Sequence, residues 1–183
     1  MIAIIGKTCV GKTFLLEKAK EFGYSTLNCD EFFQKQYKFG NDCYKIIKKS
    51  LGEKYVNEVE VDRNMIKKLI LTKNGRNNLE KLIFPVLFEH FKKFKYDFVE
   101  IPILYSKNGN FKPFFNKILN IVASSETRKK ILKFKNVDKY DFEFYDSLNN
   151  GICEEKCVDI NMDNICADSD WEFFFKSHYI KII

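Results

Sequence analysis

The sequence predicts an α/β fold, a three-layer sandwich in which a five-stranded parallel sheet lies between layers of helices. Two observations lead to this prediction. Short apolar segments rich in β-branched and aromatic residues alternate with helix-length segments, as in sheets joined by helical crossovers. A glycine-rich loop also joins the first apolar segment directly to the first helix-length segment. The predicted strands are residues 1–5, 24–27, 98–101, 118–123 and 158–162.

The composition is that of one folded domain. The chain has 183 residues, of which 45% are hydrophobic and 31% charged, so a single sizeable core can form. Residues 1–5 are too short for the core of a signal peptide, and no apolar run approaches the roughly 20 residues of a membrane span. We therefore expect a cytoplasmic protein without a membrane partner, and a monomer, with an oligomer as the open alternative.

The formal net charge of +6 rests on lysine, because arginine occurs only at Arg63, Arg76 and Arg128. No block of five like charges appears. The charge therefore favours solubility and attraction for anionic nucleotides over a nucleic-acid surface. None of the six cysteines forms a C-x-x-C pair, which excludes the usual spacing of zinc ligands. We expect free thiols.

The glycine-rich loop has the spacing G-x-x-x-x-G-K-[ST] of a phosphate-binding loop, or P-loop. Its residues are Gly6, Lys7, Thr8, Cys9, Val10, Gly11, Lys12 and Thr13. Backbone N–H groups would surround a phosphate there, and the helix N-terminus adds partial positive charge. Lys12 would reach the β- and γ-phosphates and Thr13 would bind Mg²⁺, so we expect ATP and Mg²⁺ as cofactors. A plain glycine turn is the alternative.

Residues 30–95 separate the second and third predicted strands and read as several helices. Asp62 is the predicted N-cap of a helix over 63–72, and apolar residues at helical spacing predict another over 77–95. Pro85 lies inside that second pattern and should kink or restart the helix. An insertion of this size at the ligand edge suits a substrate-binding subdomain. Packed scaffold is the alternative.

Residues 133–156 form a second insertion, which is charged and aromatic and contains the turn Asn149-Asn150-Gly151. It reads either as a lid over the nucleotide or as a plain surface excursion. The last segment, 169–181, predicts a helix capped by Asp168 or Ser169, with Trp171, Phe174, Phe175 and Ile180 on its core face. We expect a single domain with its core in 1–29, 96–132 and 157–183, a helical insertion in 30–95 and a lid in 133–156.

Phosphoryl transfer requires an acid–base group and positive charge around the transferred phosphate. Asp30 follows the second predicted strand, where it could accept the proton of an acceptor hydroxyl or bind the metal through water. An N-cap of a helix over 31–38 would also explain it. Glu100 resembles the metal-side acid of phosphate-loop enzymes, or is an ordinary strand-end charge. Lys133 and Lys135 are candidates to hold the γ-phosphate, or are solvated lysines.

These residues stand in an order that resembles the dephospho-CoA kinases almost end to end. The matching segments after the loop are Asn28-Cys29-Asp30, Leu51-Gly52, Val61-Asp62-Arg63, Leu79-Glu80-Lys81-Leu82-Ile83-Phe84-Pro85, Glu100-Ile101-Pro102-Ile103-Leu104, Ser124-Ser125-Glu126-Thr127 and Val158-Asp159-Ile160-Asn161-Met162-Asp163-Asn164. Each segment is weak by itself, and their common order and spacing carries the resemblance.

The resemblance implies ATP-dependent phosphorylation of the ribose 3′-hydroxyl of dephospho-CoA, the last step of CoA synthesis. It also implies a P-loop kinase fold with a helical substrate domain and a lid. By position, Lys12, Asp30 and Lys135 are the candidate catalytic residues, with Lys135 at the family's lid arginine. Asp30, Arg63 and Glu100 are the candidate acceptor-binding residues, and Thr13 is the candidate metal ligand.

Several positions depart from the family pattern. Lys7 and Cys9 stand where the family's loop has extra glycines, and Asn28 replaces the first Asp of Asp-Ala-Asp. The remaining departures are Gln34 for Arg, Phe84 for His, Ser106 for Glu and Lys135 for Arg. These changes could lower activity or alter the acceptor. Two alternatives stay open, a kinase for another nucleoside or nucleotide and a nucleotide-binding protein with weakened catalysis.

Overall fold

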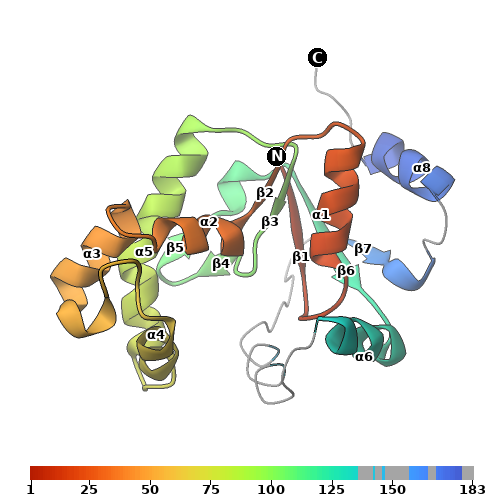
Figure 1. Cartoon of the computed structure of the whole chain (residues 1–183). Helices are drawn as coiled ribbons and strands as arrows, with labels where there is room; N and C mark the ends of the chain where they lie inside the picture. Colours follow the sequence, from red (N-terminus) through yellow and green to blue (C-terminus); the bar gives the residue numbers. More distant parts are fainter. Residues whose placement is uncertain (136–141, 143–145, 147–156, 165–167, 179–183) are drawn as a thin grey trace. The chain divides into compact units, whose positions relative to one another are not determined.

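The computed structural model describes residues 1–135, 142, 146, 157–164 and 168–178. It contains a five-stranded sheet in the order β2-β3-β1-β6-β7, in which every neighbouring pair is parallel (Figure 1). The strands are β1 (Ile2–Gly6), β2 (Thr26–Asn28), β3 (Phe98–Glu100), β6 (Lys117–Val122) and β7 (Val158–Asn161). Each overlaps one predicted strand, so the predicted α/β fold with a five-stranded parallel sheet is confirmed.

Strand β1 is central, with β3 and β6 as its two neighbours. Its residues Ile2, Ala3, Ile4 and Ile5 are all buried, as expected for a strand of a parallel sheet that is covered on both faces. Because the strands are parallel, their carboxyl ends meet at one edge of the sheet. The loop after β1 opens at that edge, where open α/β sheets bind their ligands.

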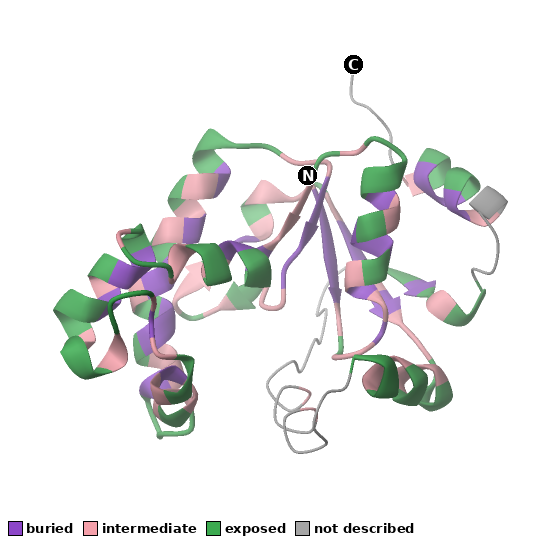
Figure 2. Cartoon of the chain, in the orientation of Figure 1, coloured by how far each residue is buried: buried purple, intermediate pink, exposed green. Residues whose placement is uncertain are grey.

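Two helices share a core with this sheet, α1 (Lys12–Glu21) and α8 (Asp168–His178) (Figure 1). Figure 2 shows the buried residues of the strands and of α1. The predicted core residues Trp171, Phe174 and Phe175 are buried in α8, whereas Ile180 lies outside the described residues. The shared core consists of Ile2, Ile4, Val10, Leu15, Leu16, Ala19, Phe98, Leu119, Ile121, Ile160, Trp171, Phe174 and Phe175.

The chain divides into two compact units, and the first unit contains the sheet in Met1–Asn28, Tyr96–Leu104 and Phe115–Ile183. The second unit contains Cys29–Lys95 and Tyr105–Phe114. Its helices are α2 (Cys29–Gln36), α3 (Asp42–Leu51), η1 (Glu53–Tyr55), α4 (Arg63–Ile70), α5 (Gly75–Lys93) and η2 (Lys112–Phe114). It also contains a hairpin of β4 (Tyr105–Ser106) and β5 (Gly109–Asn110), which the sequence did not predict.

The two helices that the sequence predicts over 63–72 and 77–95 begin close to their predicted starts, as α4 and α5. Asp62 is the N-cap of α4, because its Oδ1 accepts hydrogen bonds from the N–H groups of Asn64 and Met65 at 2.9 and 3.0 Å. Helix α5 continues through Pro85 without restarting. Within the described part of the chain, no helix combines the length and the apolar character that a membrane span requires.

Candidate phosphate-binding site

The loop between β1 and α1 has the glycine-dependent backbone that a phosphate-binding loop needs. Gly6 has φ 141° and Gly11 has φ 99°, both in the region that favours glycine. A Cβ at Gly6 would collide with the backbone carbonyl oxygen of Ile121 on the neighbouring strand β6. Gly11 stands at the N-cap position of α1, so the loop leads directly into the positive end of the helix dipole.

The two loop residues that depart from the family pattern differ in backbone conformation. Cys9 adopts a left-handed backbone with φ 59°, whereas Lys7 has no positive φ. A left-handed conformation costs a non-glycine residue about 1–2 kcal/mol. Desolvation by burial raises the pKa of the Cys9 thiol, and the nearby positive charges of Lys135, Arg128 and Lys12 oppose this effect. The loop therefore forms without the extra glycines, with strain at one residue.

Lys12 is held inside the loop. Its side chain is almost completely buried, and its Nζ donates hydrogen bonds to the carbonyl oxygens of Gly6 at 3.1 Å and Lys7 at 2.7 Å. The same Nζ lies 4.0 Å from Oε1 of Glu100 at the end of β3. A lysine that follows the loop glycine in the sequence thus has its ammonium group in the concave part of the loop, where a phosphate would bind.

Glu100 gathers polar groups from two strands and the first helix. It is only 5% exposed, and its Oε2 accepts hydrogen bonds from Thr13 Oγ1 at 3.2 Å and Asn28 Nδ2 at 2.8 Å. A hydroxyl and a carboxylate are hard oxygen ligands of the kind that Mg²⁺ prefers, and Mg²⁺ commonly uses one or two protein ligands together with water and phosphate. Thr13 and Glu100 therefore fit a magnesium ion that also binds a nucleotide.

Arg128 is a residue of this site that the sequence analysis did not identify. It belongs to α6 (Ser125–Phe134), whose N-cap Ser124 accepts a hydrogen bond from Thr127 N–H at 3.2 Å. Arg128 Nε donates to the Thr8 carbonyl oxygen at 3.0 Å, and its guanidinium forms a 2.6 Å ion pair with Asp146. Asp146 Oδ1 also accepts from the Thr8 N–H at 3.2 Å. These contacts attach the P-loop to α6.

The candidate lid lysines lie at the C-terminal end of α6. Lys133 and Lys135 are both exposed, and Lys135 is close enough to the P-loop to lower the pKa of Cys9. Most of the predicted lid, 133–156, lies outside the described residues. Of that segment beyond Lys135, the structure describes Phe142 and Asp146, and the Phe142 ring lies 5.1 Å from the Arg128 guanidinium.

Two of the three candidate acceptor-binding residues, Asp30 and Arg63, belong to the second unit, whereas the third, Glu100, ends β3 in the first unit. Helix α2 begins at Cys29, so exposed Asp30 is in its first turn rather than at an N-cap before residue 31. Arg63 is the first residue of α4, and its guanidinium lies 4.0 Å from Glu60. The Val61 N–H donates to the Tyr37 carbonyl oxygen at 2.9 Å, which joins the end of α2 to the segment before α4.

The charges of Asp30 and Arg63 both affect the pKa of Tyr37. Burial raises the pKa of its hydroxyl, the charges of Cys43 and Asp30 raise it further, and Arg63 opposes them. Asp30 and Arg63 are therefore both close enough to Tyr37 to act on it electrostatically. Direct contacts join Lys12, Thr13 and Glu100 within the first unit, whereas Asp30 and Arg63 share an electrostatic effect on Tyr37 within the second.

Two of the other departures have structural roles in the second unit. Phe84 is buried, with its ring centroid 5.2 Å from that of Phe111. Ser106 Oγ accepts a hydrogen bond from Asn108 N–H at 3.1 Å, and Asn108 Nδ2 donates to Glu80 on α5 at 3.0 Å. Phe84 therefore packs in the core of this unit, and Ser106 stabilises the hairpin turn. Gln34 is exposed on α2.

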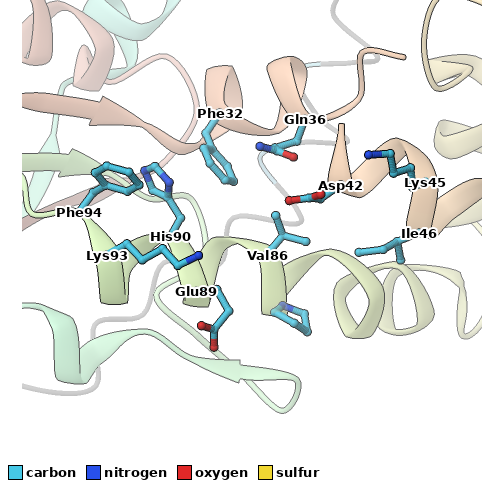
Figure 3. A pocket seen from close by; sticks show the side chains of 11 residues that line it. Phe32, Gln36, Asp42, Lys45, Ile46, Val86, Glu89, His90, Lys93 and Phe94 are labelled. Atoms are coloured by element: carbon cyan, nitrogen blue, oxygen red, sulfur yellow. The ribbon is translucent and has the colours of Figure 1, made fainter. Parts of the chain in front are cut away.

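A hollow of about 670 Å³ lies within the second unit, between α2, α3 and α5 (Figure 3). Figure 3 shows Phe32, His90 and Phe94 toward one end, and apolar, amide and charged side chains along the rest. The Oε1 atom of Gln36 is buried there and has no hydrogen-bond partner among the described residues. Neither Asp30 nor Arg63 lines it. The lining residues are Phe32, Gln36, Asp42, Lys45, Ile46, Pro85, Val86, Glu89, His90, Lys93 and Phe94.

Sequence comparison finds relatives with a common name. The chain is 30% identical over 146 residues to a dephospho-CoA kinase of Mycoplasma pneumoniae, which covers 75% of this chain and 73% of that protein. A dephospho-CoA kinase of Mycoplasma genitalium is 28% identical over 149 residues, covering 76% and 74%. One of Rickettsia typhi is 31% identical over 134 residues, covering 69% and 67%. No protein-family model matches the chain.

Solved structures share the fold at low sequence identity. TT1252 from Thermus thermophilus superposes with a TM-score of 0.73 at 18% identity, covering 96% of this chain and 94% of that one. A dephospho-CoA kinase from Campylobacter jejuni gives 0.58 at 16% identity, covering 96% and 95%. A shikimate kinase from Bacteroides thetaiotaomicron gives 0.56 at 12% identity, covering 96% of each chain. These structures support the fold alone.

Proposed function

The chain belongs to the dephospho-CoA kinase family, and we propose that it transfers the γ-phosphoryl group of MgATP to the ribose 3′-hydroxyl of dephospho-CoA. The relatives support the acceptor in this proposal, and the observation that carries the use of MgATP is the set of contacts around Glu100. The buried Glu100 carboxylate accepts a hydrogen bond from the Thr13 hydroxyl at 3.2 Å and lies 4.0 Å from the Lys12 ammonium. The P-loop therefore has a candidate metal-binding acid and a candidate phosphate-binding cation beside each other.

Lys12 and the loop N–H groups bind the β- and γ-phosphates of ATP. The Lys12 ammonium donates hydrogen bonds to two loop carbonyl oxygens. When ATP binds, it exchanges these acceptors for phosphate oxygens, so its charge is not left without a hydrogen-bond partner. Thr13 and Glu100 would hold the Mg²⁺ that accompanies ATP, and the ion would neutralise charge on the triphosphate. Arg128 keeps the loop in place through the Thr8 carbonyl oxygen.

Asp30 accepts the proton of the acceptor hydroxyl. As that proton leaves, the 3′-oxygen forms a bond to the γ-phosphorus, and the bond from the γ-phosphorus to the β–γ bridging oxygen breaks. ADP leaves with the electron pair of the broken bond, and Lys12 and Lys135 stabilise the negative charge. Arg63 binds the acceptor nucleotide. In this scheme 30–95 is the acceptor-binding insertion, 133–156 is the lid, and the remainder is the nucleotide-binding core.

An assay of ADP release with MgATP and a panel of acceptors tests this function. We expect release to require dephospho-CoA, with CoA identified as the product by mass spectrometry, and to be weak with adenosine or nucleoside monophosphates. Turnover with a different acceptor alone would replace the substrate while keeping the chemistry. ATP binding without turnover on any acceptor would contradict the proposed activity.

The location of the protein in the cytoplasm and its monomeric state remain predictions from the sequence. Size-exclusion chromatography with light scattering measures the second directly. A mass near 21.7 kDa is the expected result for a monomer.

A further inference from the structure

Asn28 and Glu100 form a pair that the sheet itself holds together. Asn28 is the last residue of β2 and Glu100 the last of β3, and the two are register partners in this parallel pair. Asn28 Nδ2 donates a hydrogen bond to Glu100 Oε2 at 2.8 Å. Since both residues end neighbouring strands, the distance between them is fixed by strand pairing rather than by a loop.

The pair is chemically complementary. An ionised carboxylate only accepts hydrogen bonds, and a side-chain amide offers two N–H donors. The oxygen that receives the Asn28 amide is also the one that receives the Thr13 hydroxyl, while Oε1 of Glu100 faces the Lys12 ammonium at 4.0 Å. Asn28 therefore fixes one side of a carboxylate whose other contacts are to the P-loop.

The charges explain why an amide suits this position. Lys12 supplies one positive charge to balance one buried carboxylate, and the neutral Asn28 adds a donor without adding charge. A second carboxylate at 28 would lie within hydrogen-bonding distance of Glu100, where two like charges in a buried site are costly. The neutral amide of Asn28 therefore suits a position beside the Glu100 carboxylate.

We propose that Asn28 is a positioning residue of the magnesium–nucleotide site, which holds the Glu100 carboxylate toward Thr13 and Lys12. Asn28 acts through Glu100 and does not itself contact the substrates. Without its amide, the Glu100 side chain loses one of the hydrogen bonds that hold it, and the Mg²⁺-dependent part of nucleotide binding weakens. This inference rests on the proposed function only for the use of MgATP, and not for the identity of the acceptor.

A double-mutant cycle tests the proposal at equilibrium, without turnover. Isothermal titration measures the affinity for ADP with Mg²⁺ and with EDTA in the natural protein, Asn28→Ala, Glu100→Ala and the double variant. We expect Asn28→Ala to weaken Mg²⁺-dependent binding by about tenfold, within the range of coupling between contacting residues. Metal-free binding should stay the same. In the Glu100→Ala background the same change should cost less than about twofold.

Two further variants separate the hydrogen bond from packing and folding. Asn28→Leu keeps a similar volume without a donor, and it should behave like Asn28→Ala. Thr26→Val lies on the same strand and removes a buried hydroxyl oxygen that has no hydrogen-bond partner among the described residues, so its Mg²⁺-dependent affinity should not change. Thermal melts of all variants check that the sheet remains folded.

Several outcomes would overturn the positioning role. An equal loss in the Glu100→Ala background, or a loss that persists in EDTA, would show that Asn28 does not act through Glu100. A rise in the KM for dephospho-CoA with unchanged ADP affinity would assign Asn28 to acceptor binding instead. A lower melting temperature with unchanged affinities would leave only a structural role. Failure of the natural protein to phosphorylate dephospho-CoA would contradict the proposed function, while the ADP cycle would still decide the role of Asn28.

Discussion

The Thr13 hydroxyl donates a 3.2 Å hydrogen bond to Oε2 of Glu100, although 87 positions separate the two residues in the sequence. The contact exists because β3 pairs with β1, and this pairing places Glu100 beside Ile4, just before the P-loop. The helix that starts after the loop then presents Thr13 to the same carboxylate. Strand order, rather than any local pattern, thus assembles the candidate metal site.

Removal of the P-loop lysine should abolish turnover. Lys12→Met keeps the aliphatic side chain but removes the ammonium that binds phosphate, and we expect kcat to fall by about 10²-fold or more. ADP affinity should fall as well. Lys20→Met, an exposed lysine on the same helix, is the matched control and should leave both values unchanged. Near-normal turnover by Lys12→Met would remove Lys12 from the catalytic set.

The carboxylate of Asp30 should matter for rate and not for nucleotide binding. Asp30→Asn keeps the size of the side chain but cannot accept the acceptor proton, so we expect kcat to fall by about 10²–10⁴-fold. ADP affinity should be unchanged. Its neighbour Glu31 is also exposed in the first turn of α2, and Glu31→Gln should retain full activity. Equal kcat values for the two variants would argue against a proton-accepting role.

Arg128 should support the nucleotide site through the loop backbone. Arg128→Ala removes the hydrogen bond to the Thr8 carbonyl oxygen and leaves Asp146 without its ion-pair partner. Hydrogen bonds to charged groups contribute about 1.5–3 kcal/mol to the stability of the conformation that they hold. Without this one, the phosphate-binding conformation of the loop should be less populated, and ATP affinity should fall roughly tenfold or more. Exposed Lys129 on the same helix supplies the control variant Lys129→Ala. Unchanged affinity in Arg128→Ala would show that the loop holds its shape without α6.

The Cys9 thiol should react slowly at neutral pH. Burial raises its pKa above the ordinary value, so a smaller fraction is thiolate at any pH near 7 than in a free cysteine. We expect iodoacetamide labelling of Cys9, followed by peptide mass spectrometry, to be slower than for glutathione and to accelerate as the pH rises past 9. MgATP should slow it further by covering the loop. Faster labelling than glutathione at pH 7 would contradict the raised pKa.

The sequence predicts the parts of the fold that depend on local pattern. The strand and helix that flank the P-loop, the five apolar strand segments and the Asp62 cap are each predicted from local pattern, and the structure confirms each. The hairpin β4–β5 was not predicted because its strands have only two residues each, too short for an alternating pattern. Its place in the second unit depends on the distant contact between Asn108 and Glu80.

The site was harder to predict where it depends on long-range pairing. Arg128 contacts Thr8, a loop residue 120 positions away in the sequence. The sequence offers one clue to this contact, which is that Arg128 lies in the first turn of the helix after the fourth predicted strand. From the sequence, Asn28 is only a departure from the Asp of the family pattern. Its hydrogen-bond partner Glu100 can be identified only once the register between β2 and β3 is known. Cys9 likewise raised doubt about the loop, yet the backbone accepts a left-handed non-glycine residue there.

The most direct measurement is identification of the product formed from dephospho-CoA and γ-labelled ATP. We predict transfer of the label to dephospho-CoA by the natural protein, with phosphorus NMR placing the new monoester on the ribose 3′-oxygen, and transfer slowed by about 10²-fold or more in Asp30→Asn and Lys12→Met. Label that remains in ATP or appears only as free phosphate, from a protein that binds ATP, would contradict the assignment of this chain as a working dephospho-CoA kinase.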